Sequence, residues 1–167
     1  DTILGPEMKS TGESMGIDTD FGMAYAKSQI SAGNTLPKEG TVFISVNDKD
    51  KPHIKNFAKK LANLGFALLA TNSTAEILNS ENIDCKKINK ATQGSPHVVE
   101  YLDDKKISIV INTTSGKKSI EDSRSLRRSA LNNGIPYFTT LAGAIACTEA
   151  IISMKNKKMG VMPIQDL

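Results

Sequence analysis

The chain has 167 residues and a mass of 18.0 kDa, a size that suits one domain or one domain with an appendage. Hydrophobic residues make up 39% and charged residues 23%, which is enough apolar side chain for a buried core and too little charge for a disordered chain. The longest nearly uncharged stretch, residues 141–152, is too short to span a bilayer, and the first residues lack the pattern of a signal peptide. Since Cys85 and Cys147 show no metal or redox spacing, we expect a cytoplasmic protein with free thiols and no membrane partner.

The net charge of +3 is unevenly distributed along the chain. Residues 1–40 carry three basic and six acidic side chains, whereas residues 41–167 carry eighteen and twelve. The larger part therefore has a mild attraction for anions. Nucleic-acid binding usually combines basic residues with aromatic side chains for stacking, but this chain has no Trp, and its eight Tyr and Phe fall mostly in strand-like or helix-face positions. The composition favours a small anionic ligand over a nucleic acid.

Residues 1–40 form a polar stretch that glycine interrupts repeatedly. One short helix is predicted over residues 21–32, with Gly33 as its stop and residues 36–40 as a linker. A segment of this length with few apolar residues does not bury a core by itself, so we interpret it as an appendage cut from a larger protein.

From residue 41 onward, short apolar strands alternate with helices. Strands are predicted over residues 41–46, 66–71, 84–88, 107–112 and 135–140. Helices are predicted over residues 52–64, 75–78, from Ser95 and Pro96 through Leu102, from Ser119 to Gly134, and over 142–154, with Pro96 at a first helical position. Pro136 makes the last strand an edge strand. This alternation predicts an α/β fold, a three-layer Rossmann-like sandwich with a five-stranded, mainly parallel sheet and an N-terminal helical appendage.

Polar residues gather where the predicted strands end. Ser45 and Lys51 follow the first strand, Thr71 and Thr74 the second, and residues 112–118 the fourth. Open parallel sheets bind ligands beyond the carboxyl ends of their strands, where hydroxyls, helix N-termini and lysines capture anions such as a phosphomonoester. The alternative is that these Ser and Thr residues are helix caps and turn formers without a ligand. No Walker P-loop is present.

Signals for catalysis are weak. His53 and His97 lie at predicted helix starts without a second histidine at metal spacing, which is typical of solvated or capping residues. Both cysteines fall in apolar elements, where buried, unreactive thiols are usual. No nucleophile and base form a pair, so the residues favour binding over catalysis.

The sequence also carries long motifs. Residues 4–16, which read LGPEMKSTGESMG, closely resemble the end of the carbamoyl-phosphate-forming ATP-grasp half of the carbamoyl phosphate synthetase large subunit. The remainder is similar to the C-terminal allosteric domain of that subunit, which has the methylglyoxal-synthase-like fold; the matching segments include residues 70–71, 111–116, 121–124 and 127–131. The resemblance implies two parts: the tail of the synthetic domain with its linker over residues 1–40, and the allosteric domain over residues 41–167.

The resemblance implies a regulatory module of a larger ligase. In that family the large subunit makes carbamoyl phosphate from bicarbonate, glutamine-derived ammonia and two ATP for arginine and pyrimidine synthesis. The sites for ATP, for Mg²⁺ or Mn²⁺ and for K⁺ lie upstream, so the resemblance implies no cofactor and no catalysis in this fragment. The implied partners are the rest of the large subunit, the glutaminase small subunit and, in some assemblies, further copies of the chain.

Bacterial members of that family bind UMP as inhibitor and IMP as activator in this domain. Matched position by position, the resemblance places the nucleotide pocket at ten residues: Ser45, Lys51, Thr71, Thr74, Lys90, Asn112, Thr114, Ser115, Asp122 and Ser123. It places part of a second effector site, for ornithine, at Tyr137 and Thr139. The remaining ornithine contacts come from the upstream domain.

Three places in the sequence bear on which ligand or activity the resemblance implies. Members that respond to N-acetylglutamate carry Trp where this chain has Lys90, which favours a nucleotide effector. Ser73 stands where nucleotide-binding relatives often have Gly, and its side chain narrows the approach to the phosphate. A true methylglyoxal synthase uses the aspartate of a Gly-Gly-Asp segment, but the matching residues 94–97 read GSPH. The alternative to an effector-binding domain is an interaction module that has lost its ligand and mediates assembly.

Overall fold

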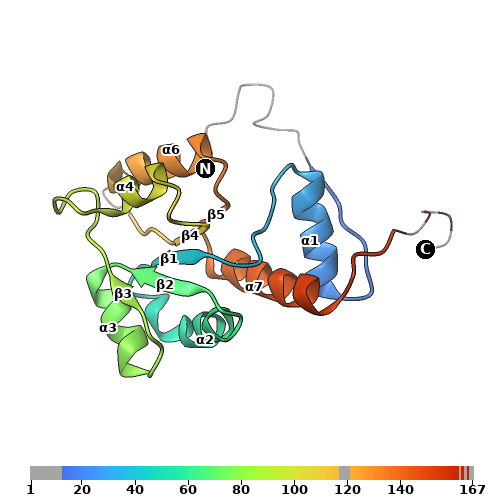
Figure 1. Ribbon diagram of the computed structural model, residues 1–167, viewed down its shortest axis with the longest axis horizontal. Helices are drawn as coiled ribbons and strands as arrows, with labels where there is room; N and C mark the ends of the chain where they lie inside the picture. The colour runs from blue at the N-terminus through green and yellow to red at the C-terminus, as the bar shows by residue number, and fades with distance from the viewer. Residues whose placement is uncertain (1–12, 117–120, 162, 164, 166–167) are drawn as a thin grey trace.

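Five parallel strands form the central sheet of the computed structural model, which describes residues 13–116, 121–161, 163 and 165. The strands are β1 (Thr41–Ser45), β2 (Ala67–Ala70), β3 (Lys86–Lys87), β4 (Ile109–Asn112) and β5 (Tyr137–Phe138). Their order across the sheet is β3-β2-β1-β4-β5, and each neighbouring pair is parallel. This arrangement confirms the predicted Rossmann-like α/β fold (Figure 1).

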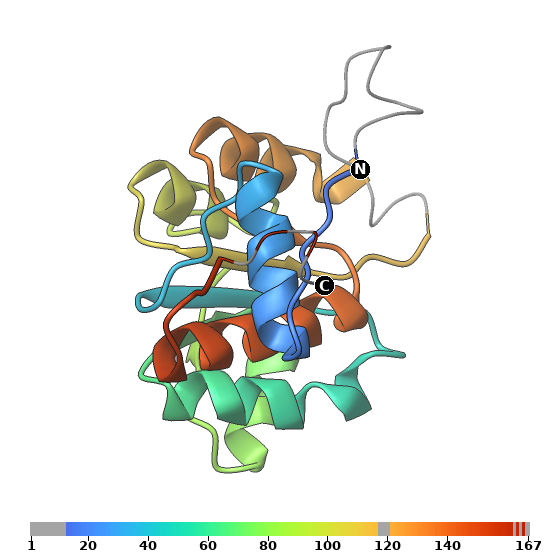
Figure 2. The ribbon, with the colours of Figure 1, turned by 90° about the vertical axis from the view of Figure 1, so that its right-hand side faces the viewer.

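Helices cover both faces of the sheet, as parallel strands require. On one face lie α2 (Lys55–Asn63), α3 (Asn72–Ser80) and α7 (Leu141–Asn156), and on the other lie α4 (Val98–Asp103) and α6 (Arg124–Asn132). A short 3-10 turn, η2 (Lys51–His53), leads into α2. The three layers are visible when the molecule is turned on its side (Figure 2).

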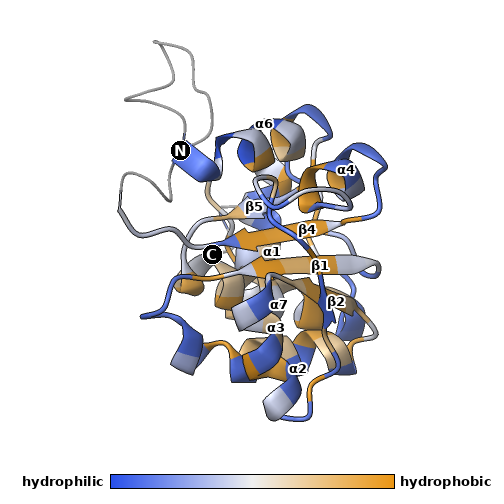
Figure 3. Ribbon diagram, turned by 90° about the vertical axis from the view of Figure 1, so that its left-hand side faces the viewer, coloured by the Kyte–Doolittle hydropathy of each residue, from blue (hydrophilic) through white to orange (hydrophobic). Residues whose placement is uncertain are grey.

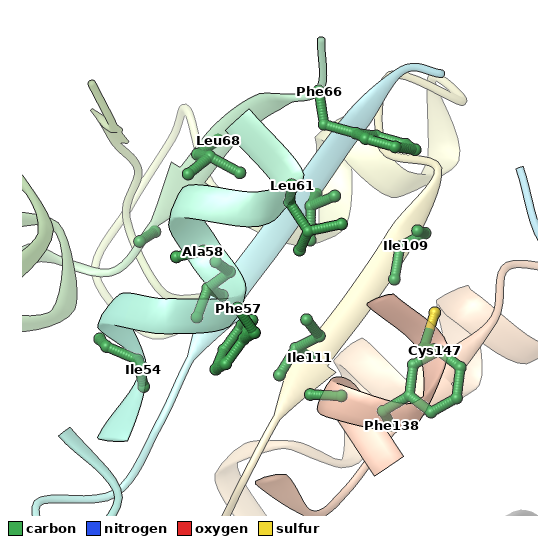
Figure 4. Close-up of a cluster of buried hydrophobic side chains, with 14 of the residues drawn as sticks. Ile54, Phe57, Ala58, Leu61, Phe66, Leu68, Ile109, Ile111, Phe138 and Cys147 are labelled. Carbon is green, nitrogen blue, oxygen red and sulfur yellow. The ribbon is translucent and has the colours of Figure 1, made fainter. Parts of the chain in front are cut away.

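The central strands are apolar on both faces because each face meets helices. In β1, Val42 and Ile44 point into the larger core cluster with α2 and α7, while Phe43 points into the smaller cluster with α4 and α6. The β1 and β4 ribbons are accordingly apolar along most of their length (Figure 3). The larger cluster includes Phe57 and Leu61 of α2 together with Ile109 and Ile111 of β4 (Figure 4).

The N-terminal helix α1 (Phe21–Ser31) packs along α7. Asp20 caps α1 by accepting a hydrogen bond from the Met23 backbone N–H at 2.9 Å, and it also accepts hydrogen bonds from Ser153 Oγ and Lys157 Nζ at the end of α7. The helical appendage therefore joins the α7 side of the sandwich. Residues 4–12, which carry most of the synthetase-like motif, lie outside the described residues, and the division at residue 40 stays a prediction.

Helix α4 starts later than the sequence pattern indicated, so the placement of Pro96 at a first helical position was wrong. Pro96 follows a cis peptide bond, and His97 is the N-cap. His97 Nδ1 accepts a hydrogen bond from the Glu100 backbone N–H, and the Glu100 carboxylate accepts one from the His97 N–H. This capping box fixes the helix start at Val98, two residues after the proline. The capping role expected for His97 is confirmed.

Other element boundaries differ by a few residues from the prediction. Helix α3 begins at Asn72 rather than near residue 75, and α2 begins at Lys55 after the 3-10 turn. Ser119, the predicted start of the next helix, lies outside the described residues, and α6 begins at Arg124. The last strand, β5, is an edge strand, as Pro136 indicated.

Two expectations from composition concern the state of the cysteines and the presence of membrane-spanning helices. Cys85 and Cys147 are free and buried, as predicted, and burial raises the pKa of each thiol to about 12, which leaves both unreactive. None of the helices within the described ranges combines the length and the apolarity needed to cross a membrane.

Candidate functional site

A cavity of about 580 Å³ opens at the carboxyl ends of the strands, where β1 and β4 lie side by side. The sheet order reverses between these strands, because β2 follows β1 on one side and β4 lies on the other. Ser45 and Asn112, the last residues of β1 and β4, stand opposite each other in the register, and both line the cavity. Such switch points are the usual ligand sites of open α/β sheets.

The structure brings together nine of the ten residues predicted for a nucleotide pocket. These nine line the cavity: Ser45, Lys51, Thr71, Lys90, Asn112, Thr114, Ser115, Asp122 and Ser123. They come from four loops that are distant in the sequence, which the parallel sheet gathers at one edge. Their role in binding stays a prediction, but their convergence is a property of the fold.

Thr74, the tenth residue, is placed differently. Its side chain is fully buried in the first turn of α3, and it is not among the residues that line the cavity. Its hydroxyl group has no hydrogen-bond partner within the described part of the chain. A buried, unpartnered hydroxyl has a free-energy cost, so contacts within the described residues do not explain the hydroxyl group of Thr74.

The N-terminus of α3 borders the cavity through Thr71 and Ser73. Thr71 is the N-cap residue, but its side chain does not cap the helix; its hydroxyl instead donates a long hydrogen bond of 3.4 Å to Ser45 Oγ. No side-chain cap from Thr71 therefore occupies the N–H groups of the first turn of α3. Free N–H groups and the helix dipole together attract anions. Ser73, the departure from the relatives' Gly, lies exposed at this point of the wall.

Three lysines and two aspartates supply the charge of the cavity wall: Lys49, Lys51, Lys90, Asp48 and Asp122. Lys51 Nζ donates to Asp48 Oδ1 at 2.5 Å. This hydrogen bond lowers the pKa of the Asp48 carboxyl, and the positive charges of Lys51 and Lys90 lower it further. The balance leaves the wall with one positive charge in excess, which suits an anionic guest.

Asn47 and Thr113 hold the loops after β1 and β4 together. Thr113 Oγ1 accepts hydrogen bonds from the backbone N–H and from Nδ2 of Asn47, each at 3.1 Å. Asn47 Oδ1 in turn accepts from the backbone N–H groups of Lys49 and Asp50, and its Nδ2 donates to Asp50 Oδ2. These contacts fix the loop that carries Asp48 and Lys51. Thr113 was not among the predicted site residues.

One wall of the cavity is apolar, and the sequence reasoning missed it. Phe43, Val98 and Leu126 line the cavity and also belong to the smaller core cluster, so the core extends to the cavity wall. In the sequence these residues follow ordinary core periodicity, which gives no sign that one edge of the cluster borders a cavity. A cavity that is lined by both apolar side chains and lysines suits a ligand with an apolar part and an anionic group.

Tyr137 and Thr139, predicted for the second effector site, line a smaller cavity of about 200 Å³. Its wall also includes Gln29 and Asn34 from the end of α1 and the following turn, and Arg127 from α6. Asn112 Nδ2 donates a hydrogen bond of 2.6 Å to Tyr137 Oη, so a residue of the larger cavity contacts a residue of the smaller one.

The described residues hold no cluster of three or more His, Cys, Asp or Glu side chains with the geometry of a metal site. The two histidines lie apart, at η2 and at the start of α4. The larger cavity offers cations, hydroxyls, amides and apolar surface, which are groups that bind and orient a ligand.

Known proteins similar to this chain include carbamoyl phosphate synthase large chains. The chain is 48% identical over 166 residues to the large chain of Mesorhizobium japonicum and 49% identical over 166 residues to that of Methanobrevibacter smithii, which in each case covers 99% of the chain. Over its full length it is 48% identical to the C-terminal section of the large chain of Methanopyrus kandleri. The chain spans only 14%, 16% and 31% of these three proteins.

A solved structure of methylglyoxal synthase from Elizabethkingia anophelis shares the fold, with a TM-score of 0.56 over 68% of this chain and 79% of that one, at 17% sequence identity. The family described as the MGS-like domain matches residues 53–139, which contain α2, β2, β3, β4, β5 and much of both cavities. Because this match covers more than half of the sequence, the chain belongs to the MGS-like domain family.

Proposed function

We propose that the chain is the regulatory, effector-binding domain of a carbamoyl phosphate synthase large chain, and that the larger cavity binds a nucleoside monophosphate of the UMP or IMP type. The observation that carries this proposal is the composition of one cavity, which joins lysines, hydroxyls and a helix N-terminus to an apolar wall. Its volume of about 580 Å³ lies within the usual range for small-molecule sites, about 300–1,000 Å³.

The phosphate occupies the polar end of the cavity in this proposal. Lys51 and Lys90 supply opposite charge, and the hydroxyl of Thr71 and the first N–H groups of α3 donate hydrogen bonds to the phosphate oxygens. The buried hydroxyl of Thr74 gains a partner if the first turn of α3 adjusts to the phosphate, which accounts for a polar group that the fold leaves unsatisfied.

The base and sugar occupy the rest of the cavity. Phe43, Val98 and Leu126 provide the apolar surface for the base, and Asn112 and Asp122 orient the base or ribose through hydrogen bonds. Thr114, Ser115 and Ser123 add donors and acceptors at the rim. This division of the cavity gives nine of the ten predicted residues, all but Ser45, a role that follows from the side chain.

The effector acts on catalytic sites that lie elsewhere in the parent enzyme. The similarity over 99% of the chain to proteins many times its length supports a module within a larger ligase that acts with a glutaminase subunit. Regulation then means a coupling free energy between this cavity and the distant ATP sites. Tyr137 and Thr139 contribute to a site for ornithine, which the upstream domain completes.

The second candidate function is an assembly module without an effector. Two apolar side chains on α1, Phe21 and Ile30, are 65% and 50% exposed, which favours a contact surface on that helix. An exposed contact surface on α1 is compatible with a ligand in the cavity. A measurement of ligand binding is therefore needed to distinguish the effector-binding domain from the assembly module.

Isothermal titration calorimetry of the chain with UMP and with IMP tests the proposal. We expect saturable heat for at least one nucleotide and none for the corresponding nucleoside, because the phosphate contacts supply much of the affinity. Absence of heat for both nucleotides at millimolar concentration contradicts the proposal and favours the assembly module.

Lys51→Ala tests whether this cavity is the binding site. Loss of a hydrogen bond to a charged group lowers affinity at least about tenfold. Lys106→Ala removes the same charge from an exposed lysine whose ion pair is with Asp104, so its affinity should equal that of the unmodified chain. Equal affinity in both variants would place the nucleotide elsewhere.

A further inference from the structure

Lys51, to which we assign the phosphate, forms an ion pair with the Asp48 carboxylate in the structure. Its ammonium group donates to Asp48 Oδ1 at 2.5 Å, three residues earlier in the same turn. The two partners differ sharply in exposure: the Lys51 side chain is 18% exposed, whereas the Asp48 side chain is 92% exposed. Lys51 is thus anchored in the cavity wall, while Asp48 reaches it from the solvent side.

We propose that Asp48 is an internal competitor for the phosphate at Lys51, so that a phosphomonoester binds by displacing the Asp48 carboxylate. The inference rests on the proposed function of the cavity and identifies the group of this chain that a phosphate must displace from Lys51. Asp48 lines the same cavity and makes no other ion pair within the described residues.

Displacement is favourable for a phosphomonoester because of its charge. A phosphomonoester carries about −1.5 to −2 charge at pH 7 and three acceptor oxygens, against one charge on a carboxylate. Asp48 loses little when its side chain turns fully into water, since it is nearly fully exposed already. A singly charged group such as a phosphodiester gains less at Lys51, although it must displace the same carboxylate.

The neighbouring carboxylate does not take this role. Asp50 lies two residues further along the same loop, and its Oδ2 accepts a hydrogen bond from Asn47 Nδ2 at 2.6 Å, in the network that joins Asn47 to Thr113. Asp50 is therefore part of the loop framework, and it offers a matched control for the loss of one negative charge at this place.

Calorimetry with UMP, inorganic phosphate and uridine tests the inference on three forms of the full chain: unmodified, Asp48→Asn and Asp50→Asn. For Asp48→Asn we expect UMP and inorganic phosphate to bind about 2- to 5-fold more tightly, as expected for release of an exposed ion pair. Uridine should give no saturable heat with any of the three forms, because the nucleoside has no phosphate to place at Lys51. Asp50→Asn should raise the affinity for UMP and phosphate less. The amide oxygen of the new Asn side chain still accepts a hydrogen bond from Asn47, and residue 50 makes no ion pair with Lys51.

The outcomes separate this inference from the proposed function. If the unmodified chain binds UMP and Asp48→Asn brings no gain, or a gain equal to that of Asp50→Asn, the competitor role is overturned and the binding site stands. If Asp48→Asn binds UMP and the unmodified chain does not, the competitor role is supported, whereas UMP binding by the unmodified chain, and with it the proposed function, is contradicted. If none of the three forms binds UMP or phosphate, both the proposed function and the inference are overturned.

Discussion

Asn112 Nδ2 donates a hydrogen bond of 2.6 Å to Tyr137 Oη, and this contact joins the end of β4 to the edge strand β5. Asn112 lines the larger cavity and Tyr137 the smaller, so the two predicted effector sites are one hydrogen bond apart. A ligand that moves either side chain changes the environment of the other. The contact gives a physical route for communication between the two cavities that needs no movement of the helices.

Tyr137→Phe removes the acceptor of this hydrogen bond and leaves the ring in place. We expect the affinity for UMP to fall about 2- to 10-fold, because the buried Asn112 amide loses its partner and its fixed orientation. Tyr101→Phe is the matched control, since the Tyr101 hydroxyl makes no hydrogen bond within the described residues and does not line the cavity. Calorimetry with UMP measures both variants; equal affinity in the two would show that the orientation of Asn112 does not matter for the nucleotide.

Thr74→Val replaces a buried hydroxyl, which has no partner among the described residues, by a methyl group of similar size. We expect the free energy of unfolding to rise by about 1 kcal/mol, because the cost of burying an unsatisfied polar group disappears. The same variant should bind UMP more weakly if the hydroxyl serves the phosphate. Urea denaturation measures the first effect and calorimetry the second.

Thr148→Val is the control for this change. Thr148 is equally buried, but its hydroxyl donates a hydrogen bond to the Ala144 carbonyl at 2.8 Å, so its replacement should lower the free energy of unfolding by about 1 kcal/mol. A loss of stability in Thr74→Val similar to that in Thr148→Val would mean that the Thr74 hydroxyl has a partner in solution.

The sheet was predictable because its inner strands are mostly apolar. Residues 107–112 and 41–46 are short runs rich in β-branched residues, which are typical of buried strands, and Pro136 marks an edge. The strand around residue 86 carries a weaker signal, since Lys86 and Lys87 are exposed and only two residues pair with β2. The start of α4 was misplaced because proline is common at first helical positions, whereas the true cap depends on a side chain, His97, that rarely has this role.

The polar half of the site was predictable for a similar reason. The carboxyl ends of parallel strands meet at one edge, so Ser45, Thr71 and Asn112 converge whatever their separation in the chain. The apolar wall and the Lys51–Asp48 pair were not predictable, because they depend on where the core ends and on which carboxylate reaches a given lysine. Neither follows from strand periodicity.

Acid should loosen the attachment of α1 to α7. The pKa of the Asp20 carboxyl lies well below its ordinary value of 3.8, chiefly because Lys157 donates a hydrogen bond to it, and also because Ser153 and the Met23 N–H do so. A lowered pKa in the folded state stabilises the fold above pH 3.8, and this contribution is lost as the pH falls below 3.8 toward the pKa of the folded state. Asp20→Asn should therefore reduce the urea midpoint at about pH 7 and reduce it less at about pH 2.5.

Asp104→Asn is the control for this pH dependence, because the ion pair of Asp104 with Lys106 lies on the exposed end of α4 and fixes no second helix. Its urea midpoint should stay close to that of the unmodified chain at both pH values. A midpoint difference for Asp20→Asn that is the same at neutral and acid pH would show that the ionised carboxylate does not hold the two helices together.

Gly22 allows α1 to approach the backbone of α7 closely. A Cβ at this position would lie 2.4 Å from the Glu149 carbonyl oxygen and 2.4 Å from Ser153 Oγ, so Gly22→Ala forces α1 away from α7. Overpacking of this kind typically costs about 1–3 kcal/mol, which outweighs the gain of about 1 kcal/mol that alanine brings to a helix. Gly160→Ala, where an added Cβ has no neighbour within 4 Å, should leave the urea midpoint unchanged. A fall in midpoint with unchanged UMP affinity in Gly22→Ala would show that α1 stabilises the sandwich without shaping the cavity, whereas an unchanged midpoint would contradict the close contact of the two helices.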